Sequence, residues 1–364
     1  MTTLVQTLPD GPLDIIGDVH GELDALLSLL HRLGVDPERP VSERTLVFVG
    51  DLVDRGPDSP GVVALVRRLV EAGVARCVVG NHELNLLLGL KKEGNGWARG
   101  DAADHHQVRG PSGIRDVPFP SRLATGTERE DVLSFFRSLP LALVRDDIRV
   151  VHACWHRSAL DALPDRGDIP GLSNAHSGRI RAQLEVSGLD SRERAELGAF
   201  ADLKRLDIRP DRPLPAHTEG ASRRQSDHPI KVLTSGLEVP VPFPDIFFVG
   251  GKWRFVGRDS WWQRYDEAPA VVVGHYWRRR QGARVPGKPD AWETRCWTDW
   301  TGPRGNVFCV DYSVGRRFVE RDQGRTAAFE GGLAALRWPE RVLVFDDRDD
   351  VIPTTAWGAA ASDG

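Results

Sequence analysis

The chain has 364 residues, of which 40% are hydrophobic and 27% charged, and its formal net charge is −4. These values are ordinary for a soluble globular protein and exclude a broad basic field of the kind that binds nucleic acid. No stretch approaches the roughly 20 apolar residues of a membrane span, and the N-terminus lacks a signal-peptide pattern. Three of the four cysteines lie in apolar runs, which predicts buried free thiols and a cytoplasmic location.

The N-terminal part of the chain predicts three strand–loop–helix units in succession. Apolar strands over 13–16, 45–49 and 75–79 each run into a polar loop that contains glycine, and a helix follows each loop. This alternation favours a largely parallel sheet with right-handed crossovers. Because sites in such sheets lie at the carboxyl ends of the strands, the three polar loops are expected to lie together.

The amino-acid composition of the remaining chain changes several times along the sequence. Residues 91–127 are polar and without period, which predicts a long surface loop or lid. A helix over 128–138 and a hairpin ending at His152 follow. Further strands are predicted over 231–234, 246–249, 270–273, 307–311, 333–336 and 342–345.

These segments predict a domain organisation. Residues 1–155 and 231–346 are expected to form the two halves of one domain. Residues 156–230 carry charged helical segments and then a run rich in Pro, Arg, Ser and His, which predicts an inserted, mostly helical cap with a flexible return. Residues 347–364 are expected to form a frayed tail.

Polar side chains gather at five predicted strand ends. They are Asp18, His20, Asp51, Asp54, Arg55, Asn81, His82, His152 and His275. Carboxylate, imidazole and amide groups suit divalent metals of borderline hardness, and a carboxylate such as Asp51 can bridge two ions. Two ions would clamp a phosphate and acidify a bridging water into a nucleophile. The guanidinium of Arg55 matches a phosphate oxyanion.

In order and strand placement, these motifs resemble those of the phosphoprotein phosphatase branch of the calcineurin-like metallophosphoesterases. They read Gly17-Asp18-Val19-His20-Gly21, Gly50-Asp51-Leu52-Val53-Asp54-Arg55-Gly56, Gly80-Asn81-His82-Glu83, His152-Ala153 and Gly274-His275. The resemblance covers about residues 13–155 and 270–345. It implies an α/β (α+β) fold in which a β-sandwich is flanked by helices in four layers, αββα.

The resemblance also implies a role for each matched residue. Asp18, His20 and Asp51 would bind one metal ion, and Asp51, Asn81, His152 and His275 a second. His82 would be the general acid, Asp54 would orient it, and Arg55 and Asn81 would hold the substrate phosphate. A second phosphate-binding arginine is expected before His275, with Arg254 and Arg258 as candidates. The ions would be two divalent cations, Mn²⁺ first, with Fe, Zn, Co or Ni as alternatives.

The leading functional hypothesis is a phosphatase that hydrolyses phosphomonoesters, phosphoprotein Ser/Thr among them, by attack of a metal-bridging hydroxide. The alternative is a dinucleoside polyphosphate hydrolase of the symmetrical diadenosine tetraphosphate type, or a phosphatase of nucleotides or nucleic-acid ends. Under either hypothesis the expected partner is a phosphorylated protein, nucleotide or nucleic-acid end, and no binding to a membrane is expected. A non-catalytic scaffold is disfavoured, because it would not need the pair of Asp54 and His82.

Other side chains are predicted to be structural. Six histidines outside the motifs are expected on loops or the surface: His105, His106, His156, His176, His217 and His228. The tryptophans from Trp277 to Trp300 are expected to pack in the core or a lid, the alternative being a base-stacking platform. Asp311, at a strand end, is expected to be structural.

Overall fold

The computed structural model describes residues 1–110, 113–198, 203–249, 251–280, 292 and 296–358. One of its two large sheets has six strands in the order β19-β18-β17-β3-β4-β5. The parallel strands β3 (Leu13–Ile16), β4 (Thr45–Phe48) and β5 (Ala75–Cys77) are those of the three predicted units. The antiparallel strands β17 (Ala334–Trp338), β18 (Val342–Phe345) and β19 (Ile352–Pro353) extend the sheet beyond β3.

The second sheet has five strands in the order β16-β15-β9-β8-β2. Strands β9 (Ile148–Val151), β15 (Ala270–Val273) and β16 (Val307–Cys309) run parallel to one another. Strand β8 (Ala142–Val144) pairs antiparallel with β9, which confirms the predicted hairpin, and β2 (Val5–Thr7) forms the edge. Strands β1 (Thr2–Thr3) and β10 (Arg166–Gly167) form a separate small pair.

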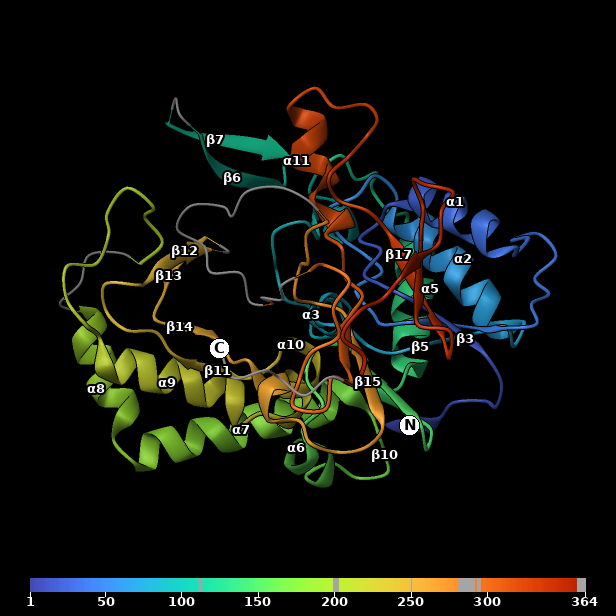
Figure 1. Cartoon of the computed structure of the whole chain (residues 1–364). Helices are drawn as coiled ribbons and strands as arrows, with labels where there is room; N and C mark the ends of the chain where they lie inside the picture. The colour runs from blue at the N-terminus through green and yellow to red at the C-terminus, as the bar shows by residue number, and fades with distance from the viewer. Residues whose placement is uncertain (111–112, 199–202, 250, 281–291, 293–295, 359–364) are drawn as a thin grey trace.

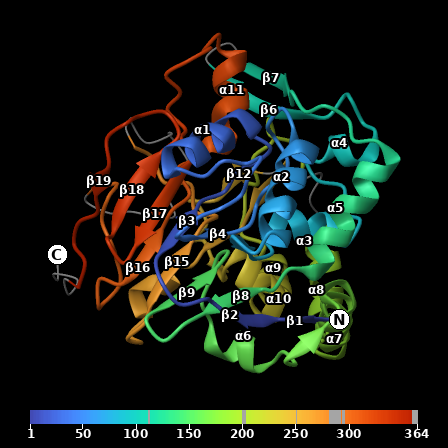
Figure 2. The same ribbon diagram turned by 90° about the vertical axis from the view of Figure 1, so that its right-hand side faces the viewer.

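Alternating side chains assign the faces of both sheets. Ile15 of β3 lies in one buried cluster with Val150 and Val272 of the other sheet, so the two sheets pack face to face. Ile16, the next residue, instead joins a cluster with Leu26 of α1 (Leu23–Leu33). Helices therefore cover the outer faces, which confirms the αββα layering (Figures 1 and 2). Each fully buried Leu, Ile or Val contributes roughly 1.5–3 kcal/mol.

Three further helices lie beside the six-stranded sheet. Helix α2 (Ser59–Glu71) begins at Asp58, whose carboxylate accepts the Gly61 N–H at 2.8 Å, a predicted cap. Helix α3 (Asn81–Leu87) follows β5 after a short loop, and its first residues belong to the polar motif that ends at Glu83. Helix α5 (Gly126–Ser138) agrees with the predicted helix over 128–138.

Residues 91–127 contain regular structure, so the prediction of a long loop was wrong in part. Helix α4 (Gly96–Arg99) precedes a hairpin of β6 (His105–Gly110) and β7 (Gly113–Pro118). The hairpin packs against α11 (Arg317–Asp322), as Figure 1 shows. The ring centres of Phe119 and Phe318 are 4.7 Å apart, and Arg115 forms an ion pair with Asp322. The packing partner of the hairpin lies about 200 residues away in sequence, so the polar local sequence did not predict the hairpin.

Helices dominate residues 156–230, as predicted. They are α6 (Arg157–Asp161), α7 (Ile169–Val186), α8 (Leu189–Gly198) and α9 (Pro215–Ser226), the last lying where a flexible return was expected. The strand predicted over 231–234 is wrong, because α10 (Pro229–Ser235) covers it. Pro229 suits the first helical turn, and Ile230 and Leu233 bury one face against the core, so helix packing overrides strand propensity.

Short strands follow the helices. Strand β11 (Glu238–Pro240) pairs with β14 (Val256–Arg258), and β12 (Phe247–Val249), where a strand was predicted, pairs with β13 (Lys252–Arg254). Two 3₁₀ turns are η1 (Trp261–Arg264) and η2 (Val314–Arg316). No helix in the described ranges is both long and apolar enough to cross a membrane.

The expected frayed tail is wrong for the residues up to 358. Strand β19 pairs with β18, and the Trp357 ring lies 4.6 Å from Trp300 and 5.3 Å from Trp338. These aromatic partners precede Trp357 by many residues, so no local pattern predicts the contact. Residues 359–364 lie outside the described residues.

Two histidines expected at the surface are buried under the helices. His228 is 0% exposed and His176 7%, and their ring centres lie 5.7 Å apart. His228 Nδ1 accepts the Lys231 N–H and caps α10, while its Nε2–H donates to the Ser173 carbonyl oxygen at 3.0 Å. Burial, and then the charge of Lys231, lowers the pKa of His228 from 6.5 to about 4.

This lowered pKa predicts a pH-dependent stability. As pH falls, His228 is protonated in the unfolded chain before it is protonated in the folded chain. The contribution of neutral His228 to the free energy of unfolding is therefore complete above about pH 6.5 and is lost as pH falls toward 4. Between pH 7.5 and pH 5, the unfolding free energy of the parent chain should fall by about 2 kcal/mol more than that of the His228→Asn variant, which keeps a capping oxygen. Denaturant titrations measure this, with exposed His31→Asn as control. Parallel pH profiles for parent and His228→Asn would contradict the assignment.

Candidate metal and phosphate site

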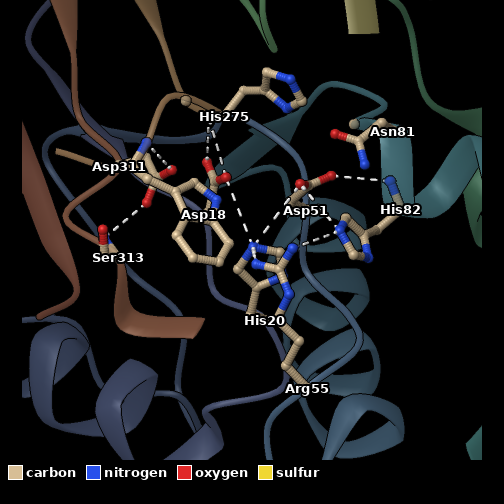
Figure 3. A network of polar contacts seen from close by, with 12 residues as sticks. Asp18, His20, Asp51, Arg55, Asn81, His82, His275, Asp311 and Ser313 are labelled. Carbon is tan, nitrogen blue, oxygen red and sulfur yellow. Dashed lines mark hydrogen bonds and ion pairs between the residues drawn. The ribbon is translucent and has the colours of Figure 1, made fainter. Parts of the chain in front are cut away.

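The predicted polar residues meet at the carboxyl ends of five strands. Asp18 follows β3, Asp51 follows β4, His82 follows β5, His152 follows β9 and His275 follows β15. All five are buried, with exposed fractions of 7% or less. Figure 3 shows Asp18, Asp51, His82 and His275 lying around this place. The structure therefore brings together the residues that the sequence motifs select.

Asp51 lies at the centre of this group. Its Oδ2 lies 3.9 Å from His20 Nε2, 3.8 Å from His82 Nε2 and 3.3 Å from His152 Nε2. Two sets of potential ligand atoms, each within 4.8 Å of one another, share Asp51: one with His20 and His82, the other with His152 and His275. One carboxylate thus stands between two places that could hold a cation.

Asp18 and Asn81 adjoin these two sets. Asp18 Oδ2 lies 3.9 Å from His20 Nε2, and the Asp18 carboxylate also accepts the His275 backbone N–H at 3.1 Å. Asn81 Oδ1 lies 3.3 Å from His152 Nε2. Asp18 is therefore beside the first set and Asn81 beside the second, as the motif assignment expects.

The histidine rings are oriented with Nε2 toward Asp51. His20 Nδ1 donates to the Val53 carbonyl oxygen at 3.1 Å, and His152 Nδ1 donates to the Val49 carbonyl oxygen at 2.7 Å. Each bond places a proton on Nδ1, so Nε2 is the ring nitrogen directed toward Asp51. Within the described residues, His275 Nε2 is buried without a hydrogen-bond partner.

Burial would lower the pKa of the His152 ring, but the Asp51 carboxylate outweighs it and raises that pKa. At the other two rings burial prevails. It lowers the pKa of His20 and His275 well below 6.5, assisted by the charges of Arg55 and Arg258 respectively. Both rings are therefore neutral near pH 7, the form in which imidazole binds a metal ion.

Buried carboxylates crowd the same place. Burial, and then the charges of Asp311 and Asp51, raises the pKa of Asp18 well above its usual range. Burial would also raise the pKa of Asp51, but His152 and His82 outweigh it, and that pKa lies well below 3.8. A cation would stabilise this cluster of acidic groups.

Glu83 has a role that the sequence analysis did not assign. Its carboxylate accepts the N–H groups of Gly80, Asp51 and Leu52, each at 2.8 Å, and so ties two polar loops together. Burial, and then Asp51, raises the pKa of Glu83 to about 7. Glu83 stands in the motif at the third position of α3, the capping-box position, which was the available signal.

His82 and Asp54 form the expected pair. His82 Nδ1 lies 2.5 Å from Asp54 Oδ2, and the other oxygen of Asp54 accepts the Trp97 indole N–H at 2.7 Å. The Asp54 N–H donates to Ser59 Oγ at 2.9 Å. Trp97 was missed because it lies on α4, in the segment predicted to be a loop.

Arg55 lies against two of the rings that face Asp51. Its Nη1 is 2.7 Å from His20 Nε2 and its Nη2 is 3.2 Å from His82 Nε2. The Trp277 ring covers the guanidinium, with the Arg55 Cζ 4.6 Å from the ring centre. Arg55 is thus held beside the candidate cation place that His20 and His82 share with Asp51 (Figure 3).

The two candidate second arginines differ in placement. Arg258 lines the pocket that contains Asp51 and donates to the His275 carbonyl oxygen at 3.0 Å. Arg254 pairs with Glu238 at 2.5 Å and is absent from the described lining of that pocket. The geometry therefore favours Arg258.

The pocket above these residues has a volume of about 620 Å³. Its floor includes Asp51, Arg55 and His82, and an apolar wall comes from residues 239–242 together with Phe247. His106 of the β6–β7 hairpin also lines it, although it was expected to be a loop or surface residue. The space exceeds what one phosphate group needs.

Most of the tryptophan-rich stretch packs in the core. Trp292 lies 4.1 Å from Trp262 and 5.4 Å from Tyr276, and Trp300 lies 4.9 Å from Phe308, measured between ring centres. This confirms core packing for Trp292 and Trp300. Trp277 differs because it lines the pocket, and its backbone N–H donates to Asp311 Oδ2 at 2.9 Å.

The site motifs have an unusual backbone. Of the ten described non-glycine residues with positive φ, six belong to the site: His20, Asp51, Asp54, Arg55, His275 and Trp277. Their φ values lie between 47° and 75°, in the left-handed region that side chains disfavour. The tight turns after β3, β4 and β15 thus direct these side chains toward one centre.

Comparison with known proteins agrees with this arrangement. Residues 11–180 match the family model of the calcineurin-like phosphoesterases. The asymmetrical bis(5'-nucleosyl)-tetraphosphatase PrpE of Bacillus velezensis is 47% identical over 73 residues, which are 19% of this chain and 29% of that protein. The symmetrical bis(5'-nucleosyl)-tetraphosphatase of Pectobacterium carotovorum is 35% identical over 139 residues, 38% of this chain and 41% of that protein.

The chain thus spans less than half the length of these curated relatives. Among solved structures, a cold-active protein-tyrosine phosphatase of a Shewanella species is similar at a TM-score of 0.45 and 17% identity, covering 96% of this chain and 83% of that one. The match of residues 11–180 to the calcineurin-like phosphoesterase model confirms the predicted resemblance.

Proposed function

We propose that the protein is a metal-dependent phosphatase that hydrolyses phosphomonoesters, phosphoserine and phosphothreonine esters among them. The observation that carries the proposal is the contact of His82 with Asp54, at 2.5 Å, directly beside Arg55 and Asp51. A proton donor, a phosphate clamp and a potential metal bridge in one pocket are what hydrolysis of a poor leaving group requires.

The residues present fit two divalent cations. His275 Nε2 is buried and has no partner within the described chain, and the rings of His20 and His152 direct Nε2 toward Asp51. Asp18, His20 and Asp51 would hold one ion, and Asp51, Asn81, His152 and His275 the other. Bound ions would supply Lewis acidity and an activated water. The mixed nitrogen and oxygen donors suit Mn²⁺ and also Fe, Zn²⁺, Co²⁺ or Ni²⁺.

The protein's own groups then carry the substrate and the proton. Arg55 and Arg258 bind the nonbridging phosphate oxygens, assisted by Asn81. Water adds its hydroxyl to phosphorus and releases its other proton to solvent as the bond to the leaving oxygen breaks. Protonated His82 gives its Nε2 proton to that oxygen and takes a proton from solvent once the products have left. Asp54 accepts the Nδ1–H of His82 throughout, which holds the ring and stabilises its charged form.

A second candidate function is hydrolysis of dinucleoside polyphosphates or of nucleotide and nucleic-acid-end phosphates. The names of the relatives favour it, since those proteins are bis(5'-nucleosyl)-tetraphosphatases. The pocket volume of about 620 Å³ also accommodates more than one phosphate group. The same metal ligands and Arg55 would serve either substrate class.

We also propose a division of the chain and a compartment. Helices α6 to α9 would form the inserted cap over about residues 156–230, between the halves at 1–155 and 231–346. Three cysteines, Cys77, Cys154 and Cys309, are buried as free thiols, which favours the reducing cytoplasm.

A substrate panel with defined metals tests the proposal. We expect the purified full chain with Mn²⁺ to release phosphate from p-nitrophenyl phosphate and from at least one phosphopeptide, dinucleoside polyphosphate, nucleotide or nucleic-acid end. A chelator should remove the activity and fresh metal should restore it, because the proposed ions supply the nucleophile. If none of the five metals supports release from p-nitrophenyl phosphate, the proposed function is wrong.

A further inference from the structure

Arg316 is a cation of the pocket that has no task in the reaction described above. Arg316 ends η2 and lines the same pocket as Arg55 and His82. We propose that Arg316 binds a second phosphate of the substrate, beyond the one being hydrolysed, and so selects molecules that carry two or more phosphates. The inference rests on the proposed function, because it assigns the substrate class of the same pocket.

The backbone of η2 is held close to the candidate metal ligands. A Cβ added at Gly315 would lie only 2.4 Å from His20 Cδ2, so this turn is in direct contact with the His20 ring. The preceding Ser313 donates its N–H to Asp311 Oδ1 at 2.8 Å and its hydroxyl to the Arg278 carbonyl oxygen at 2.9 Å (Figure 3). Arg316 therefore begins one residue from a contact with His20.

The neighbouring Arg317 has a structural role, which distinguishes it from Arg316. Arg317 is 5% exposed, donates to the Gly331 carbonyl oxygen at 2.9 Å and pairs with Asp346 at 2.8 Å. By contrast, the described part of the chain gives the Arg316 guanidinium no hydrogen bond and no ion pair. A partly buried, unpaired guanidinium that faces a pocket is available for an anion.

The charges of the pocket favour an anionic ligand. The described lining contains five arginines and two carboxylates, Asp51 and Glu330. Asp51 is the proposed metal bridge, and Glu330 pairs with Arg325 at 2.9 Å. Bound cations would make the pocket still more positive. Arg55 and Arg258 are assigned to the phosphate being hydrolysed, and Arg278 donates to the carbonyl oxygens of Cys309 and Asp299. Arg316 is available for another phosphate.

The test compares a ligand with one phosphate and a ligand with several. The Michaelis or inhibition constants of adenosine 5'-monophosphate and diadenosine tetraphosphate are measured for the parent chain, Arg316→Gln and Arg316→Lys. We expect Arg316→Gln to weaken the tetraphosphate about 10-fold more than the monophosphate, since a bond to a charged group is lost. Arg316→Lys should recover part of the difference. Arg129→Gln, an exposed arginine on α5, is the matched control and should change neither constant.

Direct binding separates this inference from the proposed function. If no substrate is hydrolysed, the phosphatase assignment fails, but calorimetric titration of both nucleotides into the parent chain and Arg316→Gln still measures the subsite. A selective loss of tetraphosphate affinity supports it. Equal losses for both nucleotides, or no loss for either, in a variant with the melting temperature of the parent, would overturn it.

Discussion

Replacement of Asp51 by Asn is expected to lower kcat/KM for phosphate release at least about 1,000-fold and to reduce the bound metal. The change removes the negative charge shared by the two sets of candidate ligands. Fold should be retained, because Asn still offers an oxygen to the His82 backbone N–H, which Asp51 Oδ1 accepts at 3.0 Å. Phosphate-release kinetics, metal analysis and the melting temperature together measure this. The expected loss corresponds to roughly 4 kcal/mol of transition-state stabilisation.

Asp131→Asn is the matched control, because Asp131 lies exposed on α5 and its carboxylate pairs with Arg67. The control should keep its activity and its metal content. An Asp51→Asn protein with full activity would refute the two-metal assignment.

Replacement of His82 by Asn is expected to separate the two candidate substrate classes. An alkyl phosphate has a strongly basic leaving group, so loss of the general acid should slow it by about 10²–10⁴-fold. A dinucleoside polyphosphate leaves as a phosphate anion and should be slowed far less. The measurement is kcat for an alkyl phosphate, for p-nitrophenyl phosphate and for diadenosine tetraphosphate in the same metal.

The companion variant Asp54→Asn tests the orienting role. It removes the charge that faces His82 Nδ1 at 2.5 Å but keeps an acceptor for the Trp97 indole N–H. We expect a smaller loss with the same substrate order as for His82→Asn. If His82→Asn slows all three substrates equally, His82 acts in binding and not as the acid.

The sequence predicts the site well because the site depends on local order. Each polar loop follows a buried strand, and parallel strands deliver their ends to one edge, so Asp18, Asp51 and His82 had to approach one another. The same reasoning reached His152 and His275 through β9 and β15. Glu83 and Trp97 were not assigned, because their roles are hydrogen bonds made only after the loops have met.

The errors in the fold have a common cause. Helix α10, the β6–β7 hairpin and the segment around β19 are all stabilised by partners distant in sequence. The run over 231–234 contains the β-branched residues Val232 and Thr234, so its local propensity favours a strand, and packing against the core decides for a helix. Such contacts carry no signal in a short window of sequence.

The left-handed backbone of the site has a consequence for thermal adaptation. Each of these six non-glycine residues costs of order 1 kcal/mol relative to glycine at the same position. Glycine would relieve that cost at His20 or Asp51, but it would delete the functional group as well. We therefore expect selection for heat resistance to find its gains in the helices of residues 156–230 and in the surface turns, while these six positions keep the protein less heat-resistant than its fold allows.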